Sequence, residues 1–390
     1  MRKGWEYKKL GEVCDVINGY AFKSSKYTSQ GTRIIRITNV QKGYVVDNDP
    51  KFYSDEDFKD LFQYSLFEGD LVMSLTGNVG RVGILQKNMI PAALNQRVAC
   101  LRVKSEKMRL NYLFHLLNSN LFEIAAIQSA RGIAQLNMST EWLKNYIIPL
   151  PPPSTQLAIV SELDKINELI RLKKEQLKDF DNLAQSLFYE MFGDPVENEK
   201  GWEVKKLGDV CTIGTGSTPN RKNKDFYENG TYPWVKSTEV CNLPIYSVEE
   251  YITGEALKNS NCTLYPENTI LMAMYGQGKT RGQIGLLKIE ACTNQAVAAI
   301  IPTKEVIDEI FLCQHLMLMY EHIRNMARGG NQANLNLSIV KSIQIFLPPL
   351  PLQRLFAQRI EQIEREKSEV QKSIQDLETL LASRMQYWFE

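Results

Sequence analysis

The stretch Pro151-Pro152-Pro153-Ser154-Thr155-Gln156 opens the segment that decides the fold. The proline cluster cannot continue a strand ladder, and the Ser154 hydroxyl can cap the first free amides of a helix. After it, apolar residues recur at alternating steps of four and three, the heptad pattern of a helix that packs along another helix. This seam contains Ile159, Leu163, Ile166, Ile170, Leu177 and Phe180. Only Lys173 breaks it, so the sequence predicts one long helix over residues 151–192.

The same seam returns in the same register near the end of the chain, after Pro348-Pro349-Leu350-Pro351. Its members are Phe356, Ile360, Ile363, Val370, Ile374 and Leu377. Lys367 and Arg384 are its exceptions. Two long helices with matching apolar stripes, each closing one half of the chain, predict a coiled coil within the molecule. We expect an antiparallel pair, because the first helix leads away from the first half and the second must return from the second half.

The remaining sequence reads as two copies of one domain. Residues 4–14 return as residues 201–211 with only two differences, Tyr7 against Val204 and Glu12 against Asp209. Shorter anchors follow in the same order: Asn95-Gln96 with Asn294-Gln295, Ala130-Arg131-Gly132 with Ala327-Arg328-Gly329, and Leu136-Asn137 with Leu335-Asn336. Between the anchors, residues 44–60 and 243–257 share little. A kept framework with changed loops is how binding domains vary, although drift after duplication would give the same pattern.

These patterns predict an α+β fold with two tandem, homologous mixed α/β domains and two long helices. The first domain covers residues 1–150, the first helix 151–192, the second domain 193–347 and the second helix 348–390. β-Branched and aliphatic runs predict strands at residues 33–40, 71–75, 81–85 and 97–103, and at 232–236, 269–274, 283–288 and 296–301. One helix is expected in each copy, over residues 108–128 and 306–327. A helix of about 38 residues would be about 55 Å long and would act as a spacer.

Composition sets limits on the class of protein. A hydrophobic content of 44% and a charged content of 23% fit a globular protein, and 390 residues are too many for one ordinary core. No apolar run reaches the length of a membrane span, and the first residues lack a signal-peptide core, so we expect a cytoplasmic protein. The seven cysteines form no CxxC pair, which favours buried thiols over a zinc site. A net charge of +1 neither indicates nor excludes nucleic acid.

Motifs that would carry chemistry are weak. Residues 274–280 resemble the tail of a phosphate-binding P-loop, but Ala273 stands where that motif needs glycine, and the first copy has no Lys-Ser/Thr there. The Pro-Pro pairs lack the flanking residues of an amino-methyltransferase tetrapeptide. The Glu-x-Lys triplets beginning at Glu6 and Glu203 have no partner carboxylate at suitable spacing. His115 and His315 occupy similar points of the two expected helices and fit structural roles. We therefore expect no catalytic residue, no metal and no cofactor.

A recurrent set of polar and basic residues at turns is the better candidate for function. In the first copy these residues are Arg36, Thr38, Asn39, Thr76, Asn78, Arg81 and Arg131. In the second copy they are Lys236, Ser237, Thr238, Tyr275, Gln277, Lys279, Arg281 and Arg328. Arg and Lys suit guanine edges and phosphates, while Asn and Gln suit adenine, so we interpret the set as DNA-binding. The retained Asn-Gln pairs fit a structural role in a turn, whereas Asn78 against Gln277 is a difference that suits base reading.

The doubled order of these motifs resembles the specificity subunit of a type I restriction-modification system. The features that carry the resemblance are Gly-Trp-x-x-Lys-Lys-Leu-Gly at each start, the glycine-rich turn after an apolar strand, and Leu-Pro before each long helix. The segment 187–195 is also typical of the family's central join. Together they cover nearly the whole chain.

The resemblance implies two target-recognition domains, each binding one half of a split, asymmetric double-stranded DNA site. An antiparallel coiled coil would set the gap between the half-sites, and two methyltransferase subunits would dock on the chain. Restriction subunits would then complete the nuclease, and the specificity subunit itself would have no catalytic residues. Two alternatives stay open from the sequence alone. The chain could be a DNA-modifying enzyme, as a nuclease or a methyltransferase fragment, or a coiled-coil adaptor that binds only protein.

Overall fold

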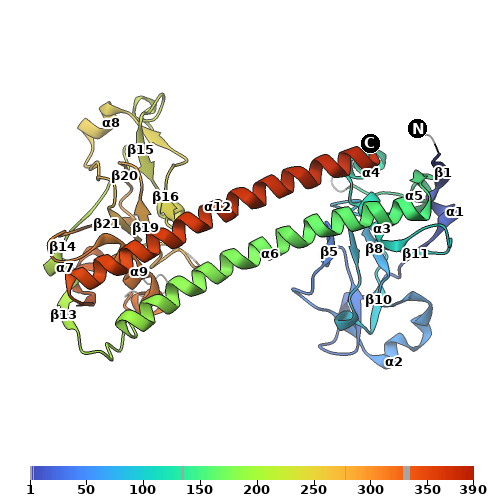
Figure 1. The fold of residues 1–390 in the computed structure, drawn as a ribbon, viewed down its shortest axis with the longest axis horizontal. Helices are drawn as coiled ribbons and strands as arrows, with labels where there is room; N and C mark the ends of the chain where they lie inside the picture. The colour runs from blue at the N-terminus through green and yellow to red at the C-terminus, as the bar shows by residue number, and fades with distance from the viewer. Residues whose placement is uncertain (1, 3, 133–135, 277, 328–333) are drawn as a thin grey trace. The chain divides into compact units, whose positions relative to one another are not determined.

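The structure is a computed structural model that describes the 390-residue chain except residues 1, 3, 133–135, 277 and 328–333 (Figure 1). Its contacts define two compact units. Unit 1 contains residues Met1–Lys174 and Lys372–Glu390, and unit 2 contains residues Glu175–Gln371. Each unit therefore holds one globular domain together with part of α6 (Pro153–Phe192) and part of α12 (Leu350–Phe389). The long helices are shared by the two units and do not form a third one.

The globular part of unit 1 contains two four-stranded sheets. The first is antiparallel, in the order β2 (Cys14–Asn18), β11 (Val98–Val103), β8 (Leu71–Ser74), β9 (Val82–Ile84). The second has the order β6 (Phe52–Tyr53), β3 (Thr32–Ile35), β10 (Ala92–Leu94), β7 (Ser65–Leu66), with β3 and β10 parallel. Two further pairs are β1 (Glu6–Lys9) with β12 (Ile147–Leu150), and the hairpin of β4 (Val40–Gln41) and β5 (Tyr44–Val45). Its helices are α1 (Leu10–Val13), α2 (Asp55–Phe58), α3 (Leu110–Leu117), α4 (Asn120–Ser129) and α5 (Thr140–Asn145), with 3₁₀ turns η1 (Ser24–Lys26), η2 (Lys59–Tyr64) and η3 (Lys87–Met89).

The globular part of unit 2 repeats this plan with changes at the sheet edges. Its larger sheet has the order β14 (Cys211–Thr215), β21 (Val297–Pro302), β18 (Ile270–Ala273), β19 (Ile284–Leu287), β16 (Pro244–Ile245). The smaller sheet has β15 (Tyr232–Val235) between β17 (Tyr251–Ile252) and β20 (Cys292–Thr293), and β13 (Glu203–Lys206) pairs with β22 (Gln344–Leu347). Its helices are α7 (Leu207–Val210), α8 (Gly254–Asn259), α9 (Glu309–Leu318), α10 (Tyr320–Asn325) and α11 (Leu337–Ser342), with 3₁₀ turns η4 (Lys224–Phe226) and η5 (Ser237–Glu239).

The predicted strands exist, mostly with slightly narrower bounds, but the stretch 33–40 is only partly a strand. Its strand β3 ends at Ile35, and a turn follows before β4. The single helix expected over residues 108–128 was wrong, because the segment forms α3 and α4. Ser119 separates them, since its hydroxyl accepts a hydrogen bond from Phe122 N and so begins a new helix. Residues 306–327 likewise form α9 and α10.

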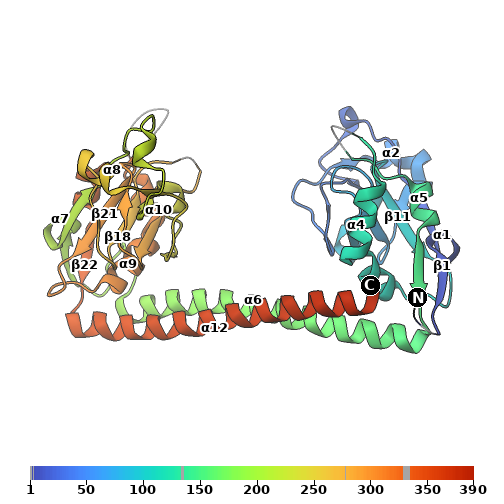
Figure 2. The ribbon, with the colours of Figure 1, turned by 90° about the horizontal axis from the view of Figure 1, so that it is seen from above.

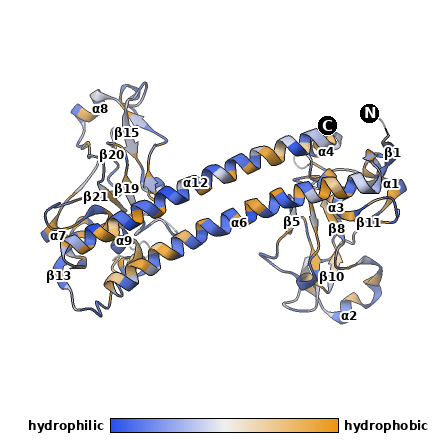
Figure 3. Cartoon of the chain, in the orientation of Figure 1, coloured by the Kyte–Doolittle hydropathy of each residue, from blue (hydrophilic) through white to orange (hydrophobic). Residues whose placement is uncertain are grey.

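Each unit has its own apolar core, to which the long helices contribute. In unit 1, Tyr112 and Phe122 pack with Ile159, Leu163 and Phe389 of the long helices. In unit 2, Phe188 and Phe192 pack with Phe311 and Phe356, and the rings of Phe188 and Phe356 lie 5.6 Å apart. Hydropathy alternates along both long helices, as Figure 3 shows. Six cysteines are buried thiols and Cys241 is exposed.

The antiparallel packing of α6 and α12 is confirmed within each unit. In unit 1 the start of α6 meets the end of α12, and in unit 2 the end of α6 meets the start of α12 (Figure 2). Most seam residues are buried, while Leu177, Phe180 and Leu377 are half-buried. The basic interruptions of the seam form ion pairs across it: Lys367 Nζ lies 2.8 Å from Asp181 Oδ1, and Arg384 pairs with Glu162. Within the described residues, no helix combines the length and the apolar character that a membrane span requires.

Candidate nucleic-acid interface

A short glycine loop, residues 75–80, joins β8 to β9 in unit 1. Ser74, the last residue of β8, fastens this loop. Its hydroxyl donates to Asn78 O and accepts from Arg81 N at 3.1 Å. Thr76 Oγ1 donates to Asn137 Oδ1 at 2.9 Å. Gly80 has φ +79°, and a Cβ there would lie 2.8 Å from Ala126 Cβ, so only glycine lets the loop pack directly on α4. These hydrogen bonds fasten the loop at both of its ends, and Asn78 within it is exposed.

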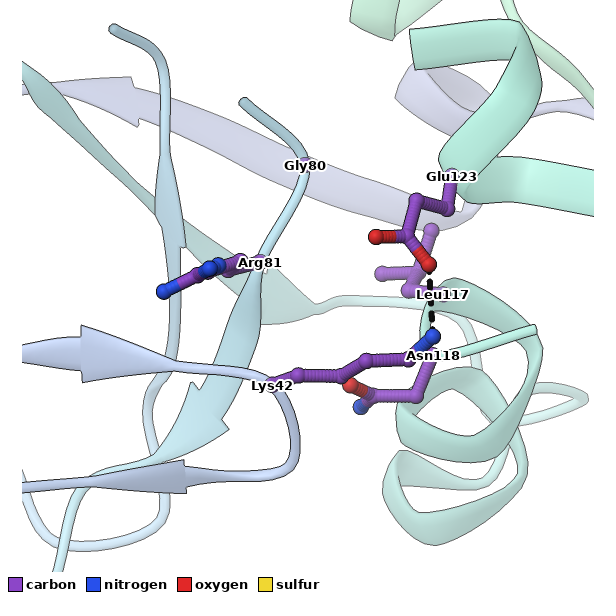
Figure 4. Close-up of a pocket in the computed structure, with 6 residues that line it drawn as sticks. All are labelled: Lys42, Gly80, Arg81, Leu117, Asn118 and Glu123. Carbon is purple, nitrogen blue, oxygen red and sulfur yellow. Dashed lines mark hydrogen bonds and ion pairs between the residues drawn. The ribbon is translucent and has the colours of Figure 1, made fainter. Parts of the chain in front are cut away.

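Arg81 leaves this loop beside the β4–β5 hairpin. Its Nη1 donates to Gln41 Oε1 at 2.8 Å, which ties the loop to the hairpin. Next to it, Lys42 of the hairpin pairs with Glu123 of α4. In Figure 4, Lys42 reaches Glu123, while the Arg81 guanidinium points away from that pair. Arg81 is half-buried, and Glu123, which lines the same pocket, is paired with Lys42.

The corresponding loop of unit 2, residues 274–282, is longer and joins β18 to β19. Strand register places Met73 opposite Val82 in unit 1, and Met272 opposite Ile284 in unit 2. Arg81 and Gln283, each immediately before its strand residue, are therefore counterparts. Arg281, which follows the glycines in sequence as Arg81 does, lies inside the longer loop and is not the counterpart of Arg81. Tyr275 and Lys279 are exposed in this loop, and Gln277 lies outside the described residues.

The turns after β3 and β15 hold their predicted residues in a different way. Arg36 Nη2 lies 3.2 Å from Asp49 Oδ2, and Lys236 Nζ lies 2.7 Å from Glu249 Oε2. Hydrogen bonds from Lys51 and Arg36 lower the pKa of Asp49, and the hydrogen bond with Glu249 raises the pKa of Lys236. Both cations are thus already paired with a carboxylate.

Asn39 supports the same turn and is buried. Its Oδ1 accepts from Arg36 N at 2.9 Å, and its Nδ2 donates to Val46 O at 2.9 Å. Glu239 does the same work in unit 2, accepting from Lys236 N and Glu249 N, each at 2.8 Å. Thr38 and Thr238 are exposed beside these turns, and Ser237 is half-buried.

The remaining predicted residues are distributed as follows. Arg131 is exposed, and Arg328 lies outside the described residues. Asn95 and Asn294 accept hydrogen bonds from the backbone N–H two residues on, at 3.2 and 3.1 Å, which agrees with the turn-holding role expected for them. Sequence reasoning missed three side chains that fasten the loops, Gln41, Tyr320 and Arg324. No motif marks them, and only their contacts with the loops identify them.

His115 and His315 are buried within the two units. His115 Nε2 lies 2.7 Å from Asp164 Oδ1 on α6, whereas His315 lies against the Phe346 ring, 4.2 Å between centroids. Arg109 N donates to Gln156 Oε1 and Asp308 N donates to Gln353 Oε1, so Arg109 and Asp308 are counterparts. His115 comes six residues after Arg109, whereas His315 comes seven after Asp308, so the two histidines are not counterparts. Across the residues that the structure describes, no cluster of three or more His, Cys, Asp or Glu side chains could hold a metal ion.

The two α+β units share a framework and differ in their loops. Each has a glycine loop framed by polar side chains, and each contains part of the helix pair. These features define a class of duplicated recognition protein. The sequence matches the type I restriction modification DNA specificity domain over residues 2–179 and again over residues 199–379. The chain therefore belongs to this family, and DNA recognition is its role.

Relatives that carry this family's name match most of the chain. The type I restriction enzyme MjaIX specificity subunit of Methanocaldococcus jannaschii is 23% identical, over 91% of this chain and 85% of the relative. The crystal structure of the type I restriction-modification S subunit from M. genitalium superposes with a TM-score of 0.57 at 15% identity, over 99% of this chain and 96% of the other. A structure determined for complex assembly and conformational transition of the type I R-M system gives a TM-score of 0.64 at 18% identity, over 99% and 97% of the two chains. The two structures share the fold of this chain.

Proposed function

We propose that each unit reads one half of a split, asymmetric DNA site with its glycine loop and the neighbouring turn. The observation that carries this proposal is the difference between two loops at the same place in a shared framework. The loop of residues 75–80 is short and fastened by Ser74 at the end of β8, and the loop of residues 274–282 is longer and fastened by α10. Two different loops on the same framework suit the recognition of two different DNA sequences.

The exposed polar residues are the proposed base readers. They are Thr38 and Asn78 in unit 1, and Thr238, Tyr275 and Lys279 in unit 2, joined by Gln277 on sequence grounds. Arg131 and Arg328, each before a glycine, are assigned to phosphate contact. Arg81 and Arg281 are assigned to the DNA backbone, where a cation binds phosphate without reading sequence. Arg36, Lys236, Asn39, Ser237 and Thr76 are assigned to the same interface, chiefly as residues that shape its turns.

The helix pair is the proposed spacer and docking surface. A helix of about 55 Å bounds the separation of the half-site centres at about 16 base pairs. Leu183 of α6 and Leu380 of α12 occupy equivalent positions outside the two seams, and they are 50% and 45% exposed. Paired exposed leucines suit two copies of one partner, which we assign as two methyltransferase subunits. Restriction subunits would join this assembly in the cytoplasm, and the chain itself would perform no chemistry.

Sequencing of methylated bases in a host that expresses the chain with its methyltransferase subunits tests this proposal. A single bipartite motif with two different halves is the expected result. Methylation or cleavage by the purified chain alone would instead favour an enzyme. Failure to capture any DNA at low salt with the partner subunits present would favour an adaptor that binds only protein.

A further inference from the structure

The longer loop of unit 2 is fastened at three backbone carbonyls by two side chains of α10. Tyr320 Oη donates to Lys279 O at 2.6 Å. Arg324 donates from Nη1 to Arg281 O and from Nη2 to Gly278 O, each at 2.8 Å. Nη1 also donates to Tyr320 Oη at 2.9 Å, and the guanidinium lies over the Tyr320 ring at 5.2 Å. The two side chains form one unit, which we call the α10 clamp.

The backbone of the loop is built to accept this clamp. Gly278 and Gly282 have φ values of +60° and +86°, which favour glycine. A Cβ on Gly282 would lie 3.0 Å from Arg324 Cγ, so the glycine allows the arginine stem to pass directly beneath the loop. Carbonyl groups in such a turn would otherwise face water. A planar guanidinium holds two of them in the fixed geometry of its fork, whereas the donors of a lysine ammonium rotate on a flexible stem.

Unit 1 has no such clamp at the corresponding place. Gly80 and Gly282 are counterparts, because each donates its backbone N–H to the carbonyl of the last residue of the preceding strand, Ser74 and Ala273. The side chains beside Gly282 are Tyr320 and Arg324, and those beside Gly80 are Phe122 and Ala126. Phe122 and Ala126 are buried apolar side chains, and neither has a donor for a backbone carbonyl. The shorter loop of unit 1 is held by Ser74 instead. The clamp is therefore specific to the second unit and accompanies its longer loop.

We propose that Tyr320 and Arg324 are positioning residues for DNA specificity at the second half-site. They hold residues 278–282 in one conformation, so that Lys279 and the neighbouring Tyr275 are presented in a fixed arrangement. A fixed loop does not have to be ordered when it binds DNA, and it can discriminate between bases that a loose loop would accept equally. This inference rests on the proposed function, since it requires that unit 2 reads a half-site with this loop.

The test uses the chain assembled with its methyltransferase subunits and duplexes that carry a mismatch in one half-site, once the wild-type motif is known. Arg324→Met keeps an unbranched stem and removes the donors, Tyr320→Phe removes only the hydroxyl, and Arg324→Lys keeps the charge. His322→Gln changes an exposed side chain on the same helix and is the matched control. The readout is the ratio of methylation rates on matched and mismatched duplexes, with thermal unfolding measured beside it.

We expect Arg324→Met to lower discrimination at the second half-site about tenfold, the order of one lost base-pair preference, with the first half-site unchanged. Arg324→Lys and Tyr320→Phe should fall between Arg324→Met and the wild type, and His322→Gln should match the wild type. Equal loss at both half-sites, or unchanged discrimination in Arg324→Met and Tyr320→Phe, would overturn the inference. If Arg324→Met does not fold, Tyr320→Phe decides alone. A wild-type complex that reads no split motif would instead refute the proposed function.

Discussion

Glu162 of α6 accepts hydrogen bonds from Arg384 of α12, with Arg384 Nη2 3.1 Å from Glu162 Oε2. Trp388 Nε1 donates to the same oxygen at 2.9 Å. Arg384 is one of the two cations that interrupt the apolar seam of α12, and Lys367 is the other. Both interruptions face a carboxylate on α6, so each fixes the register of the antiparallel pair in its own unit.

Replacing Glu162 should weaken this register in a pH-dependent way. The hydrogen bonds from Arg384, and then Trp388, lower the pKa of Glu162 from its ordinary 4.5. A lowered pKa means that the stabilisation is present above pH 4.5 and is lost as the pH falls further, through the pKa of the folded state. We expect Glu162→Gln to reduce hydrogen-exchange protection of residues 372–390 at pH 7. The difference from wild type should close at acid pH.

Glu168→Gln is the control for this experiment. Glu168 pairs with Arg171 within α6, and the hydrogen bonds from Arg171 lower its pKa as well. Because that pair joins two residues three positions apart on α6, its loss should leave the protection of residues 372–390 unchanged. Equal loss of protection in the two variants would show that the charge of α6, and not the contact with Arg384, supports the pair.

Charges placed in the seam should separate the helices and spare the domains. Ile166 and Ile363 are buried, at 7% and 8% exposed, so an aspartate at either position would be a buried and unpaired charge. Ile166→Asp and Ile363→Asp should each cost about 3 kcal/mol or more. Hydrogen exchange should report open long helices beside protected β-sheets.

Aspartate at one exposed position of α6 in each unit provides the comparison. Leu169 in unit 1 and Leu183 in unit 2 are 47% and 50% exposed, and their replacement should change stability by no more than about 0.5 kcal/mol. Full protection of both long helices in Ile166→Asp and Ile363→Asp would contradict the assignment of the seam.

Arg81 and its brace Gln41 should affect DNA binding in different ways. Arg81→Ala removes a phosphate-binding cation, so it should weaken binding of the assembled complex and lower the slope of log affinity against log salt by about 1. Gln41→Ala leaves the cation in place but removes its 2.8 Å hydrogen bond, so binding should weaken at an unchanged slope. Fluorescence anisotropy at several salt concentrations measures both quantities. Unchanged binding in both Arg81→Ala and Arg281→Ala would remove these loops from the interface.

The sequence was most informative where periodicity and repetition carry the fold. The seams and the strand positions follow from the spacing of apolar residues, and the duplicated domains follow from the repeated sequence. It was least informative where a single side chain decides the outcome. The Ser119 cap splits a predicted helix, and the inserted loop residues remove the equivalence of Arg81 and Arg281. Contacts such as Arg324 with Gly278 join residues far apart in the chain, and neither residue type nor spacing marks them in advance.

His315 should make the stability of unit 2 depend on pH. Its ring is buried among Phe188, Phe311 and Phe346, with Pro195 O 3.3 Å from Nε2, and burial lowers its pKa from 6.5 to about 4. The unfolded chain therefore takes up a proton below pH 6.5, while the folded unit does so only near pH 4. The contribution of His315 to the free energy of unfolding is fully present above pH 6.5. It falls by about 1.4 kcal/mol per pH unit between these values, or about 3 kcal/mol in all.

His315→Gln cannot titrate, so its free energy of unfolding should lack this pH-dependent contribution. Urea unfolding and hydrogen exchange of unit 2 measure that free energy. His322→Gln, at an exposed position of the same unit, should parallel the wild type, and equal pH slopes for wild type and His315→Gln would contradict the prediction.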